Sequence, residues 1–255
     1  MEAVRPQLTF PIPGPLSVTL PGMNDSLPVY LATRTPDARD RTTVLVRLIL
    51  VIPQYIVLLF VHIAALVVAV LGWFGALVTG RLPDFAREFL TGVLRWDTRV
   101  QGYLLLLTDE YPPFSLQPEE QYAVQIAVPP PTDLNRLAVL FRIFIAIPAA
   151  IVSGVLSTGA FLISIASWFS IVATGQMPPP IYEAVRASLR FQIRYWAYLL
   201  MLTPEYPAAV FGDTTQVGAV DEAWLVRLSP QGRTAMIVII VLGVIIDLLN
   251  YGNRL

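Results

Sequence analysis

Six charged residues recur in two segments at the same spacing, and their types could bind phosphate or form ion pairs. They are Glu88, Arg95 and Arg99 in the first segment and Glu183, Arg190 and Arg194 in the second. At 100° per residue the members of each trio fall within about 40° of one another on a helix, so each trio forms one stripe. The six residues are candidate contacts with an anionic lipid headgroup or with a partner protein. We favour structural ion pairing or phosphate anchoring that fixes the helix over either of these specific contacts.

Other residues that could do chemistry are scarce. His62 is the single histidine and cysteine is absent, whereas metal sites and catalytic triads need several ligands or an orienting partner. We interpret His62 as a polar turn or helix-packing residue. The adjacent acids Asp109 and Glu110 precede Tyr111, and we interpret them as part of a helix stop with an aromatic anchor. The sequence predicts no catalytic, cofactor or metal site, and no enzyme.

Composition places the chain in a membrane. Hydrophobic residues make up 55% of it and charged residues 14%, whereas soluble domains carry about a quarter charged residues. The mean hydropathy is +0.64. Leu48–Val78 contains no charged residue. Glu183 is the only charged residue between Arg142 and Arg186. Apolar stretches of this length are typical of bilayer-embedded segments. The formal net charge of −1 predicts no general attraction to nucleic acid.

The chain contains an internal duplication. A shift of 95 residues (124 − 29) places Val29–Pro112 on Val124–Pro207 without a gap. Prolines, tryptophans and arginines coincide: Pro53 falls on Pro148, Trp73 on Trp168, and Arg47 on Arg142. Coincidence of these residue types indicates duplication, because similar apolar composition alone would not match them.

Each copy contains an apolar stretch, about 44–80 or 139–175, ended by Thr-Gly with a proline soon after. As one helix of about 37 residues it would be about 55 Å long, well beyond a hydrocarbon core of about 30 Å. We therefore favour a helical hairpin, with its turn at Ser157–Gly159 in the second copy and at His62–Ala64 in the first. Arginines on both sides of each stretch also favour a hairpin, by the positive-inside rule. One long helix kinked at its proline is the alternative.

A mixed segment, 83–108 or 178–203, follows each apolar stretch and carries the charged stripe. We expect an amphipathic helix lying in the membrane interface, with its arginines toward lipid phosphates. Packing inside a bundle, with the arginines paired to acids of the other copy, is the alternative. If both copies are hairpins, an axis along the membrane normal relates them and the two stripes share the cytoplasmic face.

The predicted fold is an all-α integral membrane protein, built as two tandem repeats of a hydrophobic hairpin plus an interfacial helix, then one C-terminal transmembrane helix. Asp247 near the end of that last helix is expected at the interface. The lead of each repeat could be a strand or a proline-rich coil. The predicted boundaries are a proline-rich extramembrane arm (1–28), repeat 1 (29–116), repeat 2 (124–211), a polar linker (212–233) and the last helix (234–255).

The repeat resembles the DUF4389 family of small bacterial membrane proteins of unknown function. The resemblance rests on Ile-Pro within an apolar helix, Trp-Phe before Thr-Gly-x-x-Pro, and Leu107-Thr-Asp-Glu-Tyr-Pro-Pro-Phe114. The second copy departs from this pattern at Pro204 and Ala208. The resemblance implies a bacterial membrane location and supplies no reaction, ligand or catalytic residue.

Two functions are compatible with these observations. The first is a non-catalytic accessory or scaffold subunit of a larger bacterial membrane assembly, multi-pass in the cytoplasmic (inner) membrane. Its partners would be membrane lipids and other membrane protein subunits, with no cofactor and no nucleic acid. The alternative is a protein that binds or transports lipids or amphiphiles, using the paired arginine stripes for anionic headgroups.

Overall fold

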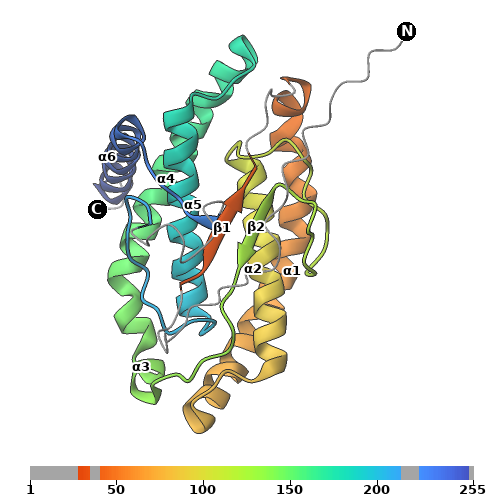
Figure 1. The fold of residues 1–255 in the computed structure, drawn as a ribbon, viewed down its shortest axis with the longest axis vertical. Helices are drawn as coiled ribbons and strands as arrows, with labels where there is room; N and C mark the ends of the chain where they lie inside the picture. The colour runs from red at the N-terminus through yellow and green to blue at the C-terminus, as the bar shows by residue number, and fades with distance from the viewer. Residues whose placement is uncertain (1–27, 35–40, 214–223, 253–255) are drawn as a thin grey trace.

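The computed structural model describes residues 28–34, 41–213 and 224–252. Figure 1 shows their arrangement, and the elements follow in the order β1 (Tyr30–Thr33), α1 (Arg41–Thr79), α2 (Asp84–Leu104), β2 (Val124–Ala127), α3 (Arg136–Leu140), α4 (Arg142–Thr174), α5 (Pro179–Leu199) and α6 (Pro230–Gly252). The proline-rich arm, apart from residue 28, and part of the linker (214–223) lie outside the described residues. Three helices, α1, α4 and α6, are long and apolar enough to cross a membrane.

The predicted hairpins are wrong, because each apolar stretch runs through its midpoint as helix. α1 is a single helix of 39 residues with Pro53 inside it, and α4 is a helix of 33 residues with Pro148 inside it. The second stretch has one interruption, at Phe141 between α3 and α4, near its start. Each copy therefore contributes one long helix, as in the alternative arrangement.

The predicted stop signals are confirmed. α1 and α4 end at Thr79 and Thr174, and the glycines that follow have φ of 78° and 79°. This left-handed conformation favours glycine and lets the Gly175 N–H bond the Ile171 carbonyl at 2.7 Å. A proline then opens the next helix, so the chain reverses within a few residues.

The two copies run antiparallel to each other. Strands β1 and β2 pair antiparallel, and Leu31 lies opposite Ile126, its own counterpart at 31 + 95. A pseudo-two-fold axis therefore passes through this residue pair. The long helices obey the same symmetry: the indole N–H of Trp73 donates to the Val139 carbonyl at 2.9 Å, and that of Trp168 donates to the Val44 carbonyl at 2.8 Å. The end of each long helix thus lies beside the beginning of the other.

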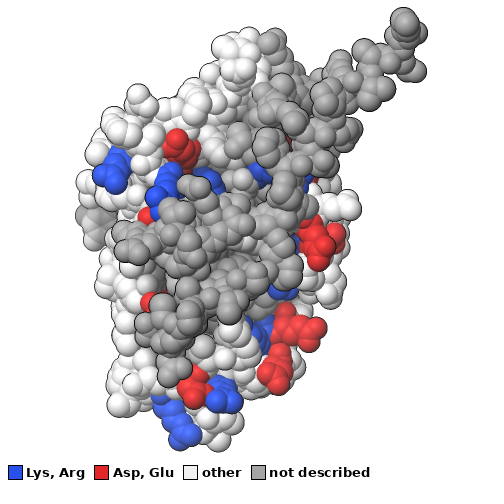
Figure 2. Space-filling model, viewed as in Figure 1, with Lys and Arg blue, Asp and Glu red and all other residues white. Residues whose placement is uncertain are grey.

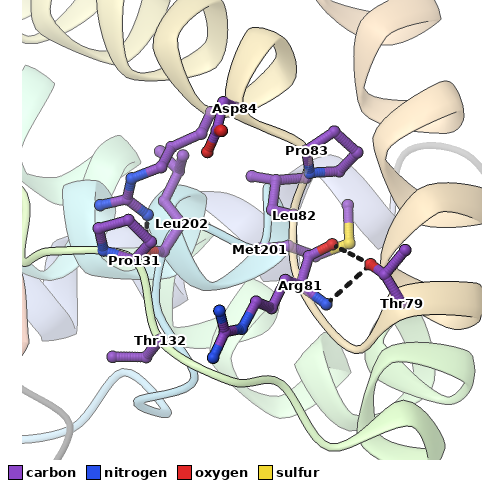
Figure 3. Close-up of a pocket in the computed structure, with 10 residues that line it drawn as sticks. Thr79, Arg81, Leu82, Pro83, Asp84, Pro131, Thr132, Met201 and Leu202 are labelled. Carbon is purple, nitrogen blue, oxygen red and sulfur yellow. Dashed lines mark hydrogen bonds between the residues drawn. The ribbon is translucent and has the colours of Figure 1, made fainter.

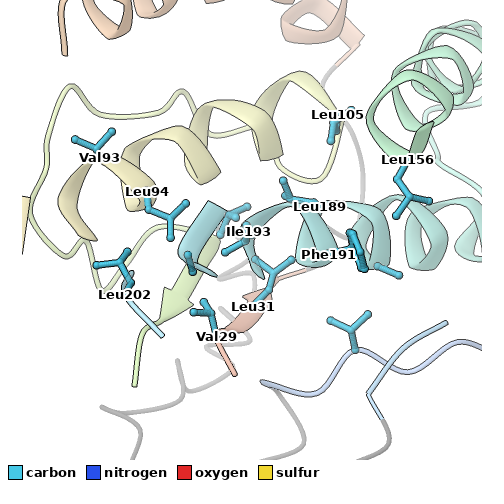
Figure 4. Packing of buried hydrophobic residues seen from close by; sticks show 14 of the residues in the cluster. Val29, Leu31, Val93, Leu94, Leu105, Leu156, Leu189, Phe191, Ile193 and Leu202 are labelled. Carbon is cyan, nitrogen blue, oxygen red and sulfur yellow. The ribbon is translucent and has the colours of Figure 1, made fainter. Parts of the chain in front are cut away.

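The elements form three layers. The strands contact α2 and α5, whereas α1, α4 and α6 pack on those two helices without touching the strands. On α2, Val100 packs with Val51 and Leu58 of α1, while a side chain at Gly102 would meet Val124 of β2. Two residues apart on a helix is about 200°, so the sheet and α1 lie on roughly opposite sides of α2. Leu31 of β1 packs with Leu94 of α2 and Ile193 of α5 where the sheet meets the middle layer (Figure 4).

The predicted interfacial position of the mixed segments is also wrong. α2 and α5 are buried between the other two layers along most of their length, with Leu90 and Leu189 at 0% and 1% exposure. Their mixed composition suits helices that contact polar loops on one side and apolar helices on the other. α2 and α5 pack inside the bundle, as in the alternative.

The last helix packs against α4 through glycines. A Cβ atom added at Gly159 would lie 1.9 Å from the Ile239 carbonyl oxygen of α6, and one at Gly243 would lie 2.1 Å from the Val155 carbonyl oxygen of α4. Glycine at these positions lets the two backbones approach closely, as in membrane helix pairs. Gly159 is thus explained by a helix contact and not by the turn that we predicted there.

We expect Gly159→Val to displace α6, because any side chain there collides with backbone that cannot move aside. The expected loss of stability is about 2–3 kcal/mol, measured as a lower thermal unfolding midpoint together with faster proteolysis near residue 230. Gly154→Val is the matched control, because a Cβ at Gly154 meets nothing within 4 Å. Equal midpoints for the two variants would contradict this account of the helix contact.

Candidate functional site

An arginine near the start of α1 holds the far end of α2. Arg47 is 2% exposed, and its Nη1 donates to the carbonyls of Tyr103 and Thr108, the latter at 2.9 Å. Its Nη2 contacts Asp109 at 2.6 Å. The guanidinium carbon also lies 4.2 Å from the centre of the Tyr103 ring, in cation–π geometry. Arg47 therefore joins the beginning of the long helix to the segment that carries the family-like motif.

Arg142 makes the equivalent contacts in the second copy. Its Nε donates to the Tyr198 carbonyl and its Nη2 to the Thr203 carbonyl, both at 2.5 Å, and its guanidinium lies 4.1 Å from the Tyr198 ring. Pro204 replaces the acid, so this clamp keeps the carbonyl and ring contacts alone. The carbonyls and the ring are therefore the shared part of the arrangement.

These clamps hold an unusual helix end. Leu106 and its counterpart Met201 have φ of 63° and 62°, a left-handed conformation that costs a non-glycine residue about 1–2 kcal/mol. The Leu107 N–H bonds the Gly102 carbonyl at 2.8 Å and the Leu106 N–H bonds the Tyr103 carbonyl at 3.2 Å, which is a Schellman motif. Leucine and methionine are retained there as buried side chains. Leu106 and Met201 thus end their helices and fill part of the core.

In the second copy the charged stripe converges on Asp213. Arg190 and Arg194 reach the same carboxylate oxygen, Oδ1, at 2.5 Å and 2.7 Å. The other oxygen, Oδ2, accepts the Val226 N–H at 2.8 Å. Arg194 also donates through Nε to the Val29 carbonyl at 2.9 Å, next to β1. The cluster ties α5, β1 and the segment before α6 together.

All members of this cluster are removed from water. The side chains of Arg190, Arg194 and Asp213 are 1%, 7% and 3% exposed. Burial lowers the pKa of Arg190 to about 10, helped by repulsion from Arg194 and opposed by the attraction of Asp213. The Arg190 guanidinium stays charged at neutral pH, so the cluster contains two cations and one anion. Such a buried group is sensitive to loss of its single carboxylate.

The first copy uses its stripe differently. Arg99 donates to the carbonyls of Ser115 and Gln117, at 2.5 Å and 3.3 Å, and lies 4.0 Å from Glu119. Arg95 is half-buried, and burial lowers its pKa. The stripe therefore fastens the loop after α2 to the bundle. Of the four stripe arginines, Arg95 retains the most contact with solvent.

The two glutamates of the stripes differ in their surroundings. Glu183 accepts hydrogen bonds from the N–H and the Oγ of Ser229, both at 2.8 Å, and so holds the start of α6. Glu88, its counterpart, is exposed. The structure thus brings Arg190 and Arg194 together on Asp213 but leaves the two glutamates outside that cluster.

Several polar groups lie on the long helices themselves. His62 lies in mid-helix, not in a turn, and its Nε2 is 2.7 Å from Asp97 of α2. Asp247 of α6 accepts a hydrogen bond from Thr158 of α4 at 3.2 Å, so it contributes to helix packing. In the described part of the chain, no three His, Asp or Glu side chains are placed to share a metal ion.

A cavity of about 350 Å³ lies where α1 turns into α2 (Figure 3). Arg81 is at its rim, paired with Asp133, and both side chains are more than two-thirds exposed. The remaining lining mixes apolar and polar groups: Thr79, Leu82, Pro83, Asp84, Arg87, Pro131, Thr132, Met201 and Leu202. Arg87 donates to the Pro129 and Leu202 carbonyls, so its guanidinium is bound to backbone oxygens at the cavity wall.

Sequence reasoning found the stripes but missed the residues that complete them. Arg47 and Arg142 coincide in the repeat, and that coincidence was the available signal for a clamp. Asp213 has no counterpart acid, because position 118 is Pro118, so the repeat gave no indication of it. The acids that the stripe arginines contact follow their own helix and do not belong to the other copy, although Arg194 also binds the Val29 carbonyl of the first copy.

The family model described as "Domain of unknown function (DUF4389)" matches the chain twice, over residues 41–115 and 136–210. The first match begins with α1 and the second with the short helix α3 just before α4, and both end after the Glu-Tyr-Pro segment, so each covers one copy without its strand. No curated protein and no solved structure matches the chain.

Proposed function

We propose, from the premise that this chain belongs to the DUF4389 family in two tandem copies, that it is a non-catalytic accessory subunit of a larger assembly in the bacterial inner membrane. One observation carries the proposal. Two equivalent helices, α1 and α4, are covered unequally: α6 packs on α4, and no described helix packs on the matching part of α1.

The surface that receives α6 can be named residue by residue. Val155, Thr158 and Gly159 of α4 contact it along its length, and Glu183 of α5 binds its first turn. We call these four residues the α6 seat. Gly159 is buried and the other three are partly buried. The seat therefore combines an apolar groove with a carboxylate at one end.

The counterpart in the first copy, the twin seat, consists of Phe60, Ile63, Ala64 and Glu88. Phe60 and Ile63 are 67% and 57% exposed, and Ala64 and Glu88 are exposed as well. In Figure 1 α6 flanks α4 at the left, and no helix flanks α1 at the right. Glu88, the equivalent of Glu183, thus lies at the equivalent end of an uncovered apolar surface.

The chemistry of the twin seat supports an apolar helix of another membrane protein as its occupant. A glutamate beside the first turn of a helix is stabilised by the free N–H groups and by the helix dipole. Glu183 provides this interaction for α6, and Glu88 is placed to provide it for an incoming helix. In a second copy of this chain the start of α6 would already be held by its own Glu183.

The fit also predicts features of the partner. α6 has Ser229 before its first turn, and Ile239, ten residues later, passes over Gly159. Ala64 replaces that glycine, so the incoming helix must lie slightly further from α1 than α6 lies from α4. We expect a Ser, Thr, Asp or Asn cap near Glu88 and a small residue about ten positions later, facing Ala64.

Ala64→Trp tests the proposal, because an indole ring there blocks the approach of a helix. After purification from the native membrane in mild detergent, this variant should retain on the order of tenfold less partner than the unaltered protein. Leu66→Trp is the matched control. Leu66 is 67% exposed and lies about 200° around α1 from Ala64, so its ring points away from the twin seat. A photo-reactive residue at Ile63 should cross-link to the same partner, within an apolar helix.

The possible outcomes distinguish a failure of the twin seat from a failure of the accessory function. No stoichiometric partner for the unaltered protein in several mild detergents would refute the accessory function. A partner that Ala64→Trp retains as well as Leu66→Trp does would refute the twin seat. A cross-link to a second copy of this chain would make the surface a homodimer contact and would refute the proposed occupant.

A further inference from the structure

A charged loop lies beside the middle of α1. His62 is near the centre of that helix, and its contact with Asp97 at 2.7 Å places this part of α2 at the same level. Two residues further along α2, Arg99 binds the carbonyls of Ser115 and Gln117 and approaches Glu119. The Gln117–Glu120 segment therefore lies level with the centre of α1. Gln117 and Glu120 are exposed, and the Glu119 side chain is 39% exposed.

The two-stranded sheet lies at the same level. It packs on α2 through Val124, which faces Gly102, and the Leu31 carbonyl of its other strand accepts a hydrogen bond from Arg186 of α5. If α1 stood across a bilayer, the exposed carboxylates of the loop would sit at the depth of the hydrocarbon centre. Charged groups are not tolerated there unless protein or water covers them.

The length of α1 also argues against a helix that stands across the bilayer. At 1.5 Å per residue its 39 residues extend about 58 Å, nearly twice a hydrocarbon core of about 30 Å. Large apolar side chains are exposed along it from Leu48 to Val78. A helix standing across the bilayer would therefore extend exposed apolar residues into water.

The polar and apolar surfaces occupy opposite sides of the molecule. On the side of the sheet layer, the face in Figure 2 shows charged side chains of the described residues at several heights, from its lower end to its upper third. The layer of α1, α4 and α6, on the other side of α2 and α5, exposes apolar side chains such as Phe60, Phe144 and Leu248.

From these observations we propose that the protein binds the membrane as a monotopic, one-sided protein. The α1, α4 and α6 layer lies within one leaflet among the acyl chains, with α1 and α4 along the membrane plane. The sheet layer and Gln117–Glu120 face water, and the pseudo-two-fold axis is parallel to the membrane normal. Both copies then have the same relation to the membrane, although their helices run in opposite directions. The accessory function is independent of this arrangement.

Depth measurements test it, using spin labels on single cysteines in the cysteine-free chain. Ile49, Ile63 and Val78 are 69%, 57% and 74% exposed on one side of α1 and extend over 29 residues (78 − 49). In nanodiscs, a helix in the plane should give the three labels similar depth, with collision with dissolved oxygen exceeding collision with a water-soluble nickel complex at each of them. A label at Glu120 should collide with the nickel complex.

The opposite results are equally clear. A label at Ile63 that is deep while those at Ile49 and Val78 are close to water would show a crossing helix and overturn the proposal. A Glu120 label shielded from the nickel complex would show that the sheet layer does not face water, and would overturn it too. Labels at Ile52 and Val70 provide an independent set if one of the first three variants does not fold.

Discussion

Asp213→Asn is expected to destabilise the protein by about 3–5 kcal/mol, and so to lower its thermal midpoint by about 10 °C. The substitution keeps the shape of the side chain and removes the one negative charge that faces Arg190 and Arg194. Two guanidinium groups, 1% and 7% exposed, would then be buried without a counter-charge. Detergent-solubilised protein heated stepwise and assayed by size exclusion gives the midpoint.

Glu120→Gln is the control for this substitution. It removes the same charge from an exposed carboxylate, so we expect a change within about 0.5 kcal/mol. Replacing both Arg190 and Asp213 with apolar residues of similar size should recover part of the loss, because no unpaired charge then remains at Arg190. A midpoint for Asp213→Asn equal to that of Glu120→Gln would show that the cluster does not stabilise the fold.

Single cysteines at Arg81 and Gln176 are expected to react with an impermeant maleimide from the same side of the membrane. The two positions are equivalent (81 + 95 = 176), both are exposed, and each follows the Thr-Gly at the end of a long helix. A two-fold axis along the membrane normal keeps equivalent residues on one side, whereas antiparallel helices that cross would place them on opposite sides. The two arrangements therefore predict opposite labelling results, with both cysteines accessible from one side or each from a different side.

The labelling is done in intact cells and again after the membrane is opened. On the proposed arrangement both positions stay unlabelled, or both are labelled, before opening, and both react afterwards. The variant with a cysteine at Ile63, buried in lipid, serves as the unreactive control. Reaction of one position alone in intact cells would demonstrate opposite topologies for the two copies and reject the one-sided arrangement.

The helix ends show what local sequence can determine. Thr-Gly followed by proline stops both long helices, because the glycine itself adopts the left-handed φ that ends a helix and proline starts the next one. The boundaries of α2 and α5 also differ by the same 95 residues as the sequence repeat (179 − 84). Duplication, family and apolar helices could all be predicted, because each depends on residue types and their order in the chain and not on tertiary contacts.

The hairpin prediction failed because glycine occurs both in turns and at close contacts between helices. Ser157–Gly159 has the residue types of a turn, yet Gly159 is required by the carbonyl of Ile239, which approaches from α6. His62, polar in a long apolar run, likewise bonds Asp97 of α2 and does not mark a break. In both cases the partner is distant in sequence, so composition along the helix could not distinguish a turn from a contact.

The candidate site divides in the same way. The sequence alone determined that arginines recur on one face of α2 and α5, because helical periodicity and duplication are properties of the chain itself. Only the tertiary structure decided that Arg194 meets Asp213 and Arg99 meets a loop, and that Glu183 holds α6 while Glu88 stands exposed. The physical reason is that equivalent side chains in a duplicated protein lie on equivalent helices but face different later segments. The segment after each copy, and not the copy, determines which charges are buried and which remain free to bind.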